Sequence, residues 1–552
     1  MEKKYHYPRP QLYRESFQSL DGTWILNQKP IQVPYPPQAL LSYYDGQIKD
    51  FLHYQKTFVL EPQMSGKDKS VHLHFGAVDQ KAKVYINHQC VGEHQGGYLP
   101  FWFDITTFLQ EGENLLEVEV TDQLSYLYPY GKQRKKHKGM WYTPVSGIWQ
   151  SVWLESVHSH YIQDLKITPT LESIQLHVET LADTYQVSII GETLFFQETF
   201  IQKDIEIEIP LAYRHLWDVD DPYLYQLIID TDDDHVESYF ALRTVDIQGQ
   251  HILLNHKPIF IHGVLDQGYF HDGLFLPYHM KEYEKDILRM KALGMNCLRK
   301  HMKIEPEAFY YACDCLGMLV IQDHVNNGKY HYMRDTVLPN IGLKFHFDYP
   351  KGKQLQKYIF QKHMLETLKH LYNHPCIIGY TIFNEGWGQM YADEMYQKCK
   401  QYDATRFYDA TSGWFHQKLS DVQSEHIYFK NKVIKKTSDK PILLSECGGY
   451  TRLIKKHTYA QKHYGYGTTH SEKELTDKII KMYEEMILPS IEYGLCGYIY
   501  TQLSDIEEEI NGFYTYDRQI CKVDTKRLLE YQKKINEKAK EFYSVVKRKL
   551  CK

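Results

Sequence analysis

Strand-like and helix-like segments alternate from about residue 249 to the C-terminus, and this alternation restricts the fold more than any other feature of the chain. Eight short apolar runs bounded by turn residues have the composition of buried strands. They are residues 258–261, 295–299, 317–322, 376–380, 406–409, 424–428, 441–445 and 497–501. Segments with helical hydrophobic spacing lie between several of them, at residues 283–293, 305–315, 354–372 and 472–488. The alternation predicts a (β/α)₈ TIM barrel over residues 249–552, with its active site at the carboxyl ends of the strands.

The residues before the barrel predict two β-sandwiches. Residues 71–75 and 114–120 alternate apolar and polar side chains with the period of a strand, which favours an antiparallel jelly roll over residues 1–160. A second series of short strands, such as 174–178, favours an immunoglobulin-like sandwich over residues 161–248. No group of reactive side chains falls in this second segment. We therefore interpret it as a spacer between the first domain and the barrel.

Composition excludes several classes of function. The chain has 552 residues, too many for one hydrophobic core. Its net charge of −6 gives no electrostatic footprint for nucleic acid, and we interpret the basic run Arg134 to Lys138 as a solvated loop. The chain starts without an apolar signal segment and has no apolar run of about 18 residues, so we predict no membrane partner and a cytoplasmic location. Ten cysteines without a Cys-x-x-Cys spacing favour reduced thiols over disulfides or a zinc site.

Two glutamates follow apolar strand-like runs and are themselves followed by glycines. Glu385 ends the run that leads into Thr381–Gln389 (TIFNEGWGQ), and Glu446 ends the run 441–445. Burial at a strand end raises the pKa of a carboxyl toward the range of a general acid. Each glutamate alone could instead be an acid at a helix N-terminus, where the helix dipole favours it. The same pattern on the fourth and seventh strands favours two carboxylates that face one another, as retaining glycoside hydrolysis requires.

Several motifs now carry a resemblance to a known family, the glycoside hydrolase family 2 enzymes, which include β-galactosidases, β-glucuronidases and β-mannosidases. In the first domain they are FGAVDQKAKVYINHQCVGEHQGGYLPFWFDIT and GMWYTPVSGIWQSVWLE. In the barrel they are GVLDQGYF, MNCLRKHMKIEP, IFNEGWGQ, SECGGY and YTQLSDIEEEINGFYTYDR, in that order. The resemblance spans nearly the whole chain. It implies a jelly-roll sugar-binding domain and a catalytic barrel.

The resemblance also implies roles for individual residues. Glu385 matches the family's acid/base and Glu446 its nucleophile. Asn384 matches the asparagine that bonds the sugar 2-hydroxyl, and Arg299 the arginine that keeps the nucleophile ionised. Tyr428 resembles the tyrosine beside the nucleophile, although Phe429 replaces the proline that commonly follows it.

Other polar residues near predicted strand ends are candidates either for sugar contacts or for structural roles. They are Asp266, His301, Asp323, His324 and Trp414. We interpret Glu305, Asp314 and the run Glu507 to Glu509 as acids at helix starts or in solvent. We predict no cofactor and no metal ligand set, although some members of the family bind Mg²⁺ or Na⁺ near the sugar.

The sugar is the least determined feature. Family glucuronidases carry an Asn-x-Lys after the eighth strand, and this chain has Asn511-Gly512-Phe513 there. We therefore expect an exo-acting retaining enzyme whose substrate is a small-molecule β-glycoside or an oligosaccharide. A neutral β-galactoside is the first choice. A β-glucuronidase or β-galacturonidase is the alternative, with Lys329, Arg518 or Lys522 as the cation. The alternative from another class of function is a non-catalytic carbohydrate-binding protein. For the oligomeric state, a homo-oligomer is one alternative.

Overall fold

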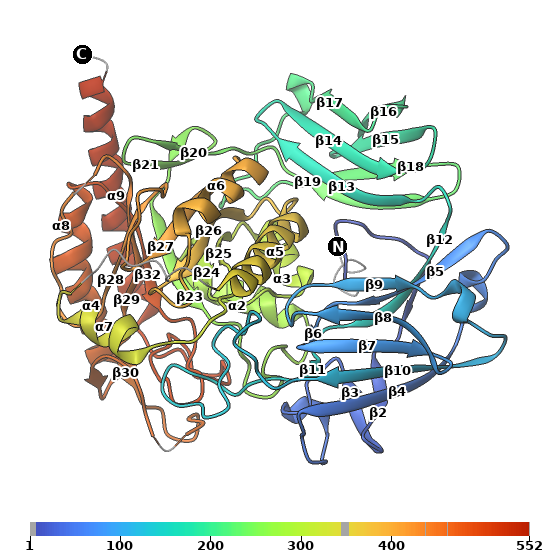
Figure 1. The fold of residues 1–552 in the computed structure, drawn as a ribbon. Helices are drawn as coiled ribbons and strands as arrows, with labels where there is room; N and C mark the ends of the chain where they lie inside the picture. The colour runs from blue at the N-terminus through green and yellow to red at the C-terminus, as the bar shows by residue number, and fades with distance from the viewer. Residues whose placement is uncertain (1–6, 344–352, 437, 461, 551–552) are drawn as a thin grey trace.

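The computed structural model describes residues 7–343, 353–436, 438–460 and 462–550. Along the chain it forms two β-sandwiches and then a barrel surrounded by helices (Figure 1). The predicted multidomain fold class is therefore confirmed. No helix among the described residues is long and apolar enough to cross a membrane.

The first sandwich consists of two antiparallel sheets with a shared apolar core. The larger sheet has the order β3-β2-β4-β10-β7-β8 and the smaller one β1-β12-β5-β9, while β6 pairs with β11. The strands are β1 (Phe17–Ser19), β2 (Gly22–Leu26), β3 (Lys29–Val33), β4 (Phe51–Val59), β5 (Lys69–Phe75), β6 (Val78–Asp79), β7 (Lys81–Ile86), β8 (Gln89–Gln95), β9 (Phe101–Asp104), β10 (Glu113–Thr121), β11 (Gly147–Ile148) and β12 (Val152–His158). Alternate residues of β10, such as Leu116 and Val118, are fully buried, as the strand period predicts. Short 3₁₀ turns η1 (Leu40–Ser42), η2 (Pro62–Met64) and η3 (Thr106–Phe108) connect the strands.

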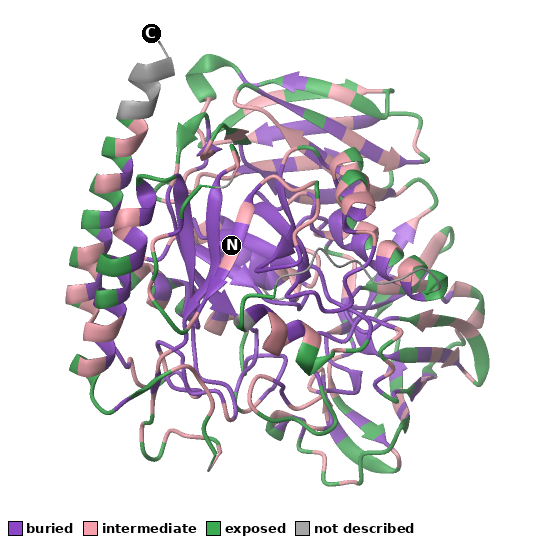
Figure 2. Cartoon of the chain, turned by 60° about the vertical axis from the view of Figure 1, so that its left-hand side comes forward, coloured by how far each residue is buried: buried purple, intermediate pink, exposed green. Residues whose placement is uncertain are grey.

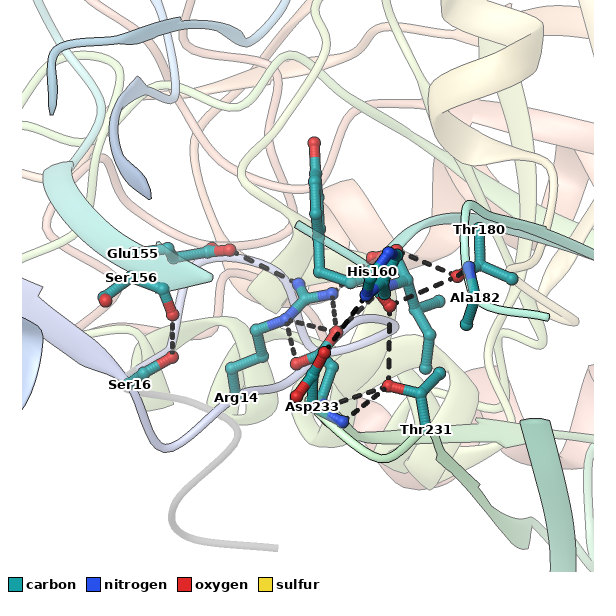
Figure 3. Close-up of polar contacts among 12 residues, drawn as sticks. Arg14, Ser16, Glu155, Ser156, His160, Thr180, Ala182, Thr231 and Asp233 are labelled. Carbon is teal, nitrogen blue, oxygen red and sulfur yellow. Dashed lines mark hydrogen bonds and ion pairs between the residues drawn. The ribbon is translucent and has the colours of Figure 1, made fainter. Parts of the chain in front are cut away.

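The second sandwich packs a three-stranded sheet, β13-β14-β17, on a four-stranded sheet, β16-β15-β18-β19. Its strands are β13 (Ile162–Pro169), β14 (Ser173–Thr180), β15 (Tyr185–Ile190), β16 (Leu194–Phe200), β17 (Asp204–Glu208), β18 (Tyr225–Asp230) and β19 (His235–Phe240), with a 3₁₀ turn η4 (Leu211–Tyr213). Arg14 joins the two sandwiches. Its Nη1 lies 3.4 Å from Glu155 on β12 (Figure 3). Its Nη2 lies 2.8 Å from Asp234, which precedes β19. The buried ion pairs restrict the orientation of one sandwich on the other.

Eight parallel strands form the barrel in the order β27-β26-β25-β24-β23-β32-β29-β28. They are β23 (Ile261–Asp266), β24 (Cys297–Lys300), β25 (Leu319–Asp323), β26 (Ile377–Asn384), β27 (Phe407–Ser412), β28 (Gln423–Ile427), β29 (Ile442–Gly448) and β32 (Leu495–Thr501). Ser424 on β28 joins the two edge strands, because its Oγ donates to Asp409 Oδ1 on β27 (2.9 Å) and lies 3.2 Å from the Thr411 carbonyl oxygen on the same strand. Figure 2 shows the strands as the buried centre of this part of the chain.

Helices cover the outside of the barrel. They are α2 (Lys281–Ala292), α3 (Glu307–Leu316), α4 (Leu338–Asn340), α5 (Gln354–Leu371), α6 (Ala392–Tyr402), α7 (Glu472–Met482), α8 (Leu488–Ile491) and α9 (Thr525–Leu550), with π-helical turns η5 (Met333–Val337) and η6 (Tyr483–Ile487) before α4 and α8. The small sheet of β20 (Val245–Gln248), β21 (His251–Leu254) and β22 (Lys257–Pro258) precedes the barrel, and β30 (Thr451–Arg452) pairs with β31 (Thr468–Thr469).

Two expected elements differ from the structure. The strand expected at 258–261 is divided, because Pro258 belongs to the edge strand β22 and the first barrel strand begins at Ile261. Proline has no N–H to donate, so it is confined to sheet edges. The helix expected over 472–488 ends as α7 at Met482 and continues through a π-helical turn into α8.

Candidate active site

Glu385 is the first residue after β26, and the backbone there turns to direct its side chain toward the barrel mouth. Its φ is +52°, and its N–H donates to the Ser412 carbonyl on β27 at 3.0 Å. A Cβ at Gly386 would lie 2.4 Å from the Phe415 ring, so the residue after Glu385 has no room for a side chain. Left-handed backbone at a non-glycine residue costs of order 1 kcal/mol or more and is concentrated at functional sites. Burial raises the pKa of Glu385, and the neighbouring charge of Glu446 adds to the increase.

Glu446 lies on β29 and faces Glu385. A carboxylate oxygen of each glutamate lies within 4.8 Å of the other, with His426 Nδ1 inside the same radius. Arg299 Nη1 donates to Glu446 Oε1 at 3.1 Å, and the Tyr428 hydroxyl donates to Oε2. Burial by itself would raise the pKa of Glu446, but the His426 and Arg299 charges outweigh it and lower the pKa well below its usual range. The two carboxyls therefore have opposite pKa shifts.

Arg299 on β24 connects the strands that carry this pair. The side chain is fully buried and donates through Nε and Nη2 to both oxygens of Asp323, each at 3.0 Å. The same guanidinium donates to the Ser445 carbonyl at 2.8 Å and to Asn384 Oδ1 at 2.8 Å. His301 Nδ1 donates to Asp323 Oδ2 at 2.6 Å, the same oxygen that accepts from Arg299 Nη2. A bidentate arginine–carboxylate pair fixes the plane of the guanidinium. The fixed guanidinium in turn fixes the positions of the Glu446 and Asn384 side chains that accept its hydrogen bonds.

His426 on β28 contacts both glutamates. Its Nδ1 lies 2.9 Å from Glu385 Oε1 and 3.6 Å from Glu446 Oε2, and its Nε2 lies 3.0 Å from Ser412 Oγ. Ser412 donates to Ser445 Oγ (2.8 Å), which donates to the Glu425 carbonyl (3.3 Å).

This chain of hydroxyls determines which histidine nitrogen carries the proton. Because a carbonyl oxygen only accepts, the Ser445 hydroxyl donates its proton to the Glu425 carbonyl. The Ser412 hydroxyl in turn donates its single proton to Ser445 Oγ. His426 Nε2 must then donate to Ser412. The contact of Nδ1 with Glu385 lowers the pKa of that carboxyl and so opposes the increase that burial causes.

The first sandwich supplies one side of the mouth through its β10–β11 loop, residues 122–146. Thr143 N donates to Glu507 Oε1 (2.9 Å), Gly139 N donates to Glu508 Oε2 (2.9 Å), and the Tyr142 hydroxyl donates to Glu509. Lys132 of the same loop is 8% exposed, and its Nζ lies 4.7 Å above the Trp387 ring. The Lys132 side chain has no hydrogen bond or ion pair in the part of the chain that the structure describes. Its charge lowers the pKa of both Glu385 and Glu509, each of which burial raises.

Only some of the remaining predicted site residues lie near the two glutamates. Trp414 packs edge-on against His426, with ring centroids 5.5 Å apart, and its buried indole N–H has no partner among the described residues. Asp323 and His301 contact the pair only through Arg299. Asp266 instead accepts from Lys300, and His324 stacks on Tyr380 at 5.4 Å, so neither contacts the two glutamates.

The expectation that Glu305, Asp314 and the Glu507–Glu509 run are acids at helix starts or in solvent is wrong, because most of them are buried and paired. Glu305 is fully buried between Lys300 and Lys303, each 2.8 Å away. Asp314 is fully buried as well and accepts from Tyr239 and from the Cys376 N–H, 2.8 Å in each case. In the third group, Glu507 and Glu509 are buried because they accept the hydrogen bonds from the β10–β11 loop. A buried carboxylate is stable only with such partners.

The cations expected to replace the uronidase lysine do not gather at the mouth. Arg518 is held by Asp286 and the carbonyls of Tyr516 and Tyr269. Lys522 is fully buried, with its Nζ 2.6 Å from Asp505. The side chain of Lys329 is exposed. Phe513 is also in the core, stacked on Tyr500 at 4.3 Å, so it is not a pocket wall.

Sequence reasoning missed His426 and Lys132. His426 precedes Tyr428 by two residues in His426-Ile427-Tyr428, and two residues along a strand share one face, which is a signal for the histidine. Lys132 had no such signal, because its position depends on how the first sandwich docks on the barrel. The Glu385, His426 and Glu446 atoms are also close enough together to hold a metal ion. Arg299 already neutralises Glu446, so the geometry does not require one, and the expectation of no metal stays a prediction.

Two family models match the chain. Residues 17–157 match the sugar-binding domain of glycosyl hydrolases family 2, and residues 245–535 match its TIM barrel domain. The chain belongs to glycoside hydrolase family 2. The resemblance inferred from the motifs is confirmed.

Similar proteins in this family carry two activities in their names. A β-galactosidase of Thermoanaerobacter pseudethanolicus is 26% identical over 59% of this chain, and a β-galactosidase large subunit of Lactobacillus helveticus is 25% identical over 73%. The chain spans 43% and 68% of the lengths of these two relatives. The structure of a β-D-glucuronidase of Dictyoglomus thermophilum superposes with a TM-score of 0.76 at 19% identity, over 94% of this chain and 98% of that one. At that identity the likeness supports the fold alone.

Proposed function

We propose that the protein is a retaining exo-β-glycosidase that removes a terminal β-linked sugar by double displacement. The observation that carries the proposal is the facing pair of Glu385 and Glu446, with oxygens within 4.8 Å of one another and pKa values shifted in opposite directions. Retaining enzymes place their carboxyls about 5–5.5 Å apart, whereas inverting enzymes need about 6.5–9.5 Å to admit a water.

The pKa shifts support an assignment of roles. Glu446, whose charge Arg299 and Tyr428 stabilise, attacks the anomeric carbon and forms the glycosyl-enzyme. Glu385, whose pKa burial raises, gives its proton to the leaving oxygen and then takes one from the water that hydrolyses the intermediate. Asn384 Oδ1 is occupied by Arg299, so its Nδ2 is the group that donates to the sugar 2-hydroxyl.

An exo-acting enzyme needs a pocket closed beyond one terminal sugar. The hydrogen bonds from the β10–β11 loop to Glu507, Glu508 and Glu509 place the first sandwich against one side of the barrel mouth. The buried indole N–H of Trp414 has no partner among the described residues and is available to donate to a sugar hydroxyl. A site built to bond hydroxyls discriminates strongly when one is lost.

For the sugar, we propose a β-galactoside first. The side chains of Arg518 and Lys522 are bonded to Asp286 and Asp505. The charge of Lys132 acts on the two acids Glu385 and Glu509, so this cation does not give the pocket a net positive charge. A β-uronide is the second candidate, and Lys132 is the observation that favours it. A buried ammonium without an ion pair among the described residues is suited to a sugar carboxylate.

A panel of nitrophenyl β-glycosides tests the proposal. We expect the β-galactoside to exceed the β-glucuronide in kcat/KM by about a hundredfold, since an uncompensated buried carboxylate costs several kcal/mol. A larger value for the glucuronide selects the second candidate. If the protein binds sugars but turns over no member of the panel, it is a carbohydrate-binding protein and the enzymatic proposal is wrong.

A further inference from the structure

A groove outside the catalytic pair combines aromatic and basic side chains. Its volume is about 440 Å³, and it lies between the β10–β11 loop and two barrel loops. The lining residues are Arg134, Lys138, Gly139, Met140, Trp141, Tyr330, Tyr332 and Tyr464. Four of the eight are aromatic rings, which suit the flat apolar face of a sugar ring.

The groove is continuous with the candidate active site on two sides. Tyr330 packs edge-on against Trp387 at 5.2 Å, and Trp387 follows Glu385 by two residues. Tyr464 lies 3.3 Å from Tyr466, hydroxyl to hydroxyl, and Tyr466 stacks on Tyr428, which donates to Glu446. A substrate whose terminal sugar reaches the two glutamates would therefore place its next unit in the groove.

The charges of the groove have one sign. The Arg134 guanidinium lies 5.2 Å above the Trp141 ring, and Trp141 stacks on Trp387 at 4.9 Å. Within the described residues, the side chains of Arg134 and Lys138 have no ion pair. Among the described residues, none of those that line the groove is a carboxylate. Glu508 is the nearby acid: it accepts the Gly139 N–H but is not itself part of the lining. By contrast, Lys135 of the same run is paired with Asp50 at 3.2 Å.

We propose that this groove binds an anionic aglycone, so that the natural substrate is an acidic oligosaccharide whose terminal β-sugar is linked to a uronate or a sulfated sugar. The inference rests on the proposed glycosidase function and specifies its substrate class. The ring of the second sugar lies on Tyr332, the exposed aromatic side chain of the groove, and its anion pairs with Arg134 and Lys138. Arginine and lysine above aromatic surfaces are the groups that bind carboxylate and sulfate oxygens.

Three disaccharides test the proposal on the full chain: lactose, galactose β-linked to glucuronic acid, and lactose whose glucose carries a sulfate ester. Galactose release gives kcat/KM for each. We expect at least one acidic substrate to exceed lactose by about tenfold at low salt, with the advantage lost as the salt concentration rises. The two acidic substrates distinguish a carboxylate from a sulfate.

A double variant and a control locate the effect. Arg134→Ala with Lys138→Ala should lower the ratio of acidic to neutral kcat/KM by about fivefold to tenfold, through KM. Lys136→Ala, an exposed cation of the same loop that does not line the groove, should leave the ratio unchanged. Equal kcat/KM for lactose and both acidic substrates overturns the acidic aglycone while the glycosidase stands. If the protein hydrolyses none of the three disaccharides and no nitrophenyl β-glycoside, the proposed function fails and this inference fails with it.

Discussion

His426 Nδ1 lies 2.9 Å from Glu385 Oε1 and 3.6 Å from Glu446 Oε2, so one imidazole ring lies beside both carboxyls. The histidine lowers the pKa of both glutamates. At Glu385 burial outweighs this effect, so the glutamate assigned to protonate the leaving group keeps a raised pKa.

Replacing His426 should move the basic limb of the pH profile. Glu385 must be protonated in the free enzyme, so kcat/KM falls as the pH rises through its pKa. In His426→Phe the contact that lowers the pKa of Glu385 is lost, so this pKa rises and the basic limb should shift to higher pH. Ser412→Ala should shift it in the same direction by less. A shift to lower pH would show that the histidine instead accepts the proton of Glu385.

The acidic limb depends on Arg299 instead. Glu446 must be ionised, so kcat/KM falls as the pH drops through its lowered pKa. Arg299→Lys keeps the charge but loses the bidentate pair with Asp323, which should lower kcat/KM by about a hundredfold and move the acidic limb to higher pH. An acidic limb in the same place would mean that Arg299 does not set the ionisation of Glu446.

The buried acid Glu305 should be important for stability. Glu305→Gln leaves the ammonium groups of Lys300 and Lys303 short of a charge partner, and breaking such a buried pair costs about 3–5 kcal/mol of unfolding free energy. Glu282→Gln, in the more exposed pair with Lys285, is the matched control and should cost less than about 1 kcal/mol. Denaturant titration measures both, and similar values would contradict the importance assigned to burial.

Local patterns predicted the barrel and the positions of Glu385 and Glu446, because a buried strand that ends in a glutamate and a glycine is visible within ten residues. Features that depend on packing between distant segments left no such pattern. Lys132 reaches Trp387 only when the first sandwich docks, and Glu305 differs from a solvated acid only through Lys300 and Lys303. Phe513 occupies the position of the uronidase lysine in the sequence, but its ring packs on Tyr500 in the core. The absence of a lysine at this position is therefore weak evidence about which sugar the pocket binds.

Lys132 decides between the two candidate sugars. If any β-uronide is hydrolysed through a pairing with this ammonium, Lys132→Met should lower its kcat/KM by about a hundredfold, while the β-galactoside should lose less because only hydroxyl contacts are affected. Kinetics with both nitrophenyl substrates give the ratio. An equal loss on the two substrates would assign Lys132 to a hydroxyl contact common to both sugars.

Azide should separate the roles of the two glutamates. Glu385→Ala should keep activity on substrates with good leaving groups and gain rate with azide, which needs no general base, giving the β-glycosyl azide. Glu446→Gln should lose both steps, and Glu446→Ala with azide should give the α-azide. Proton NMR of the products assigns the anomers, and a β-azide from Glu446→Ala would reverse the roles.

The covalent intermediate is the central claim, and trapping it is the most direct test. Incubation with an activated 2-deoxy-2-fluoro β-galactoside should inactivate the enzyme and add one fluorogalactosyl group per chain. Mass spectrometry of the digested protein should place that group on Glu446. A label on Glu385, or turnover of the nitrophenyl β-galactoside with inversion and no label, would contradict the account.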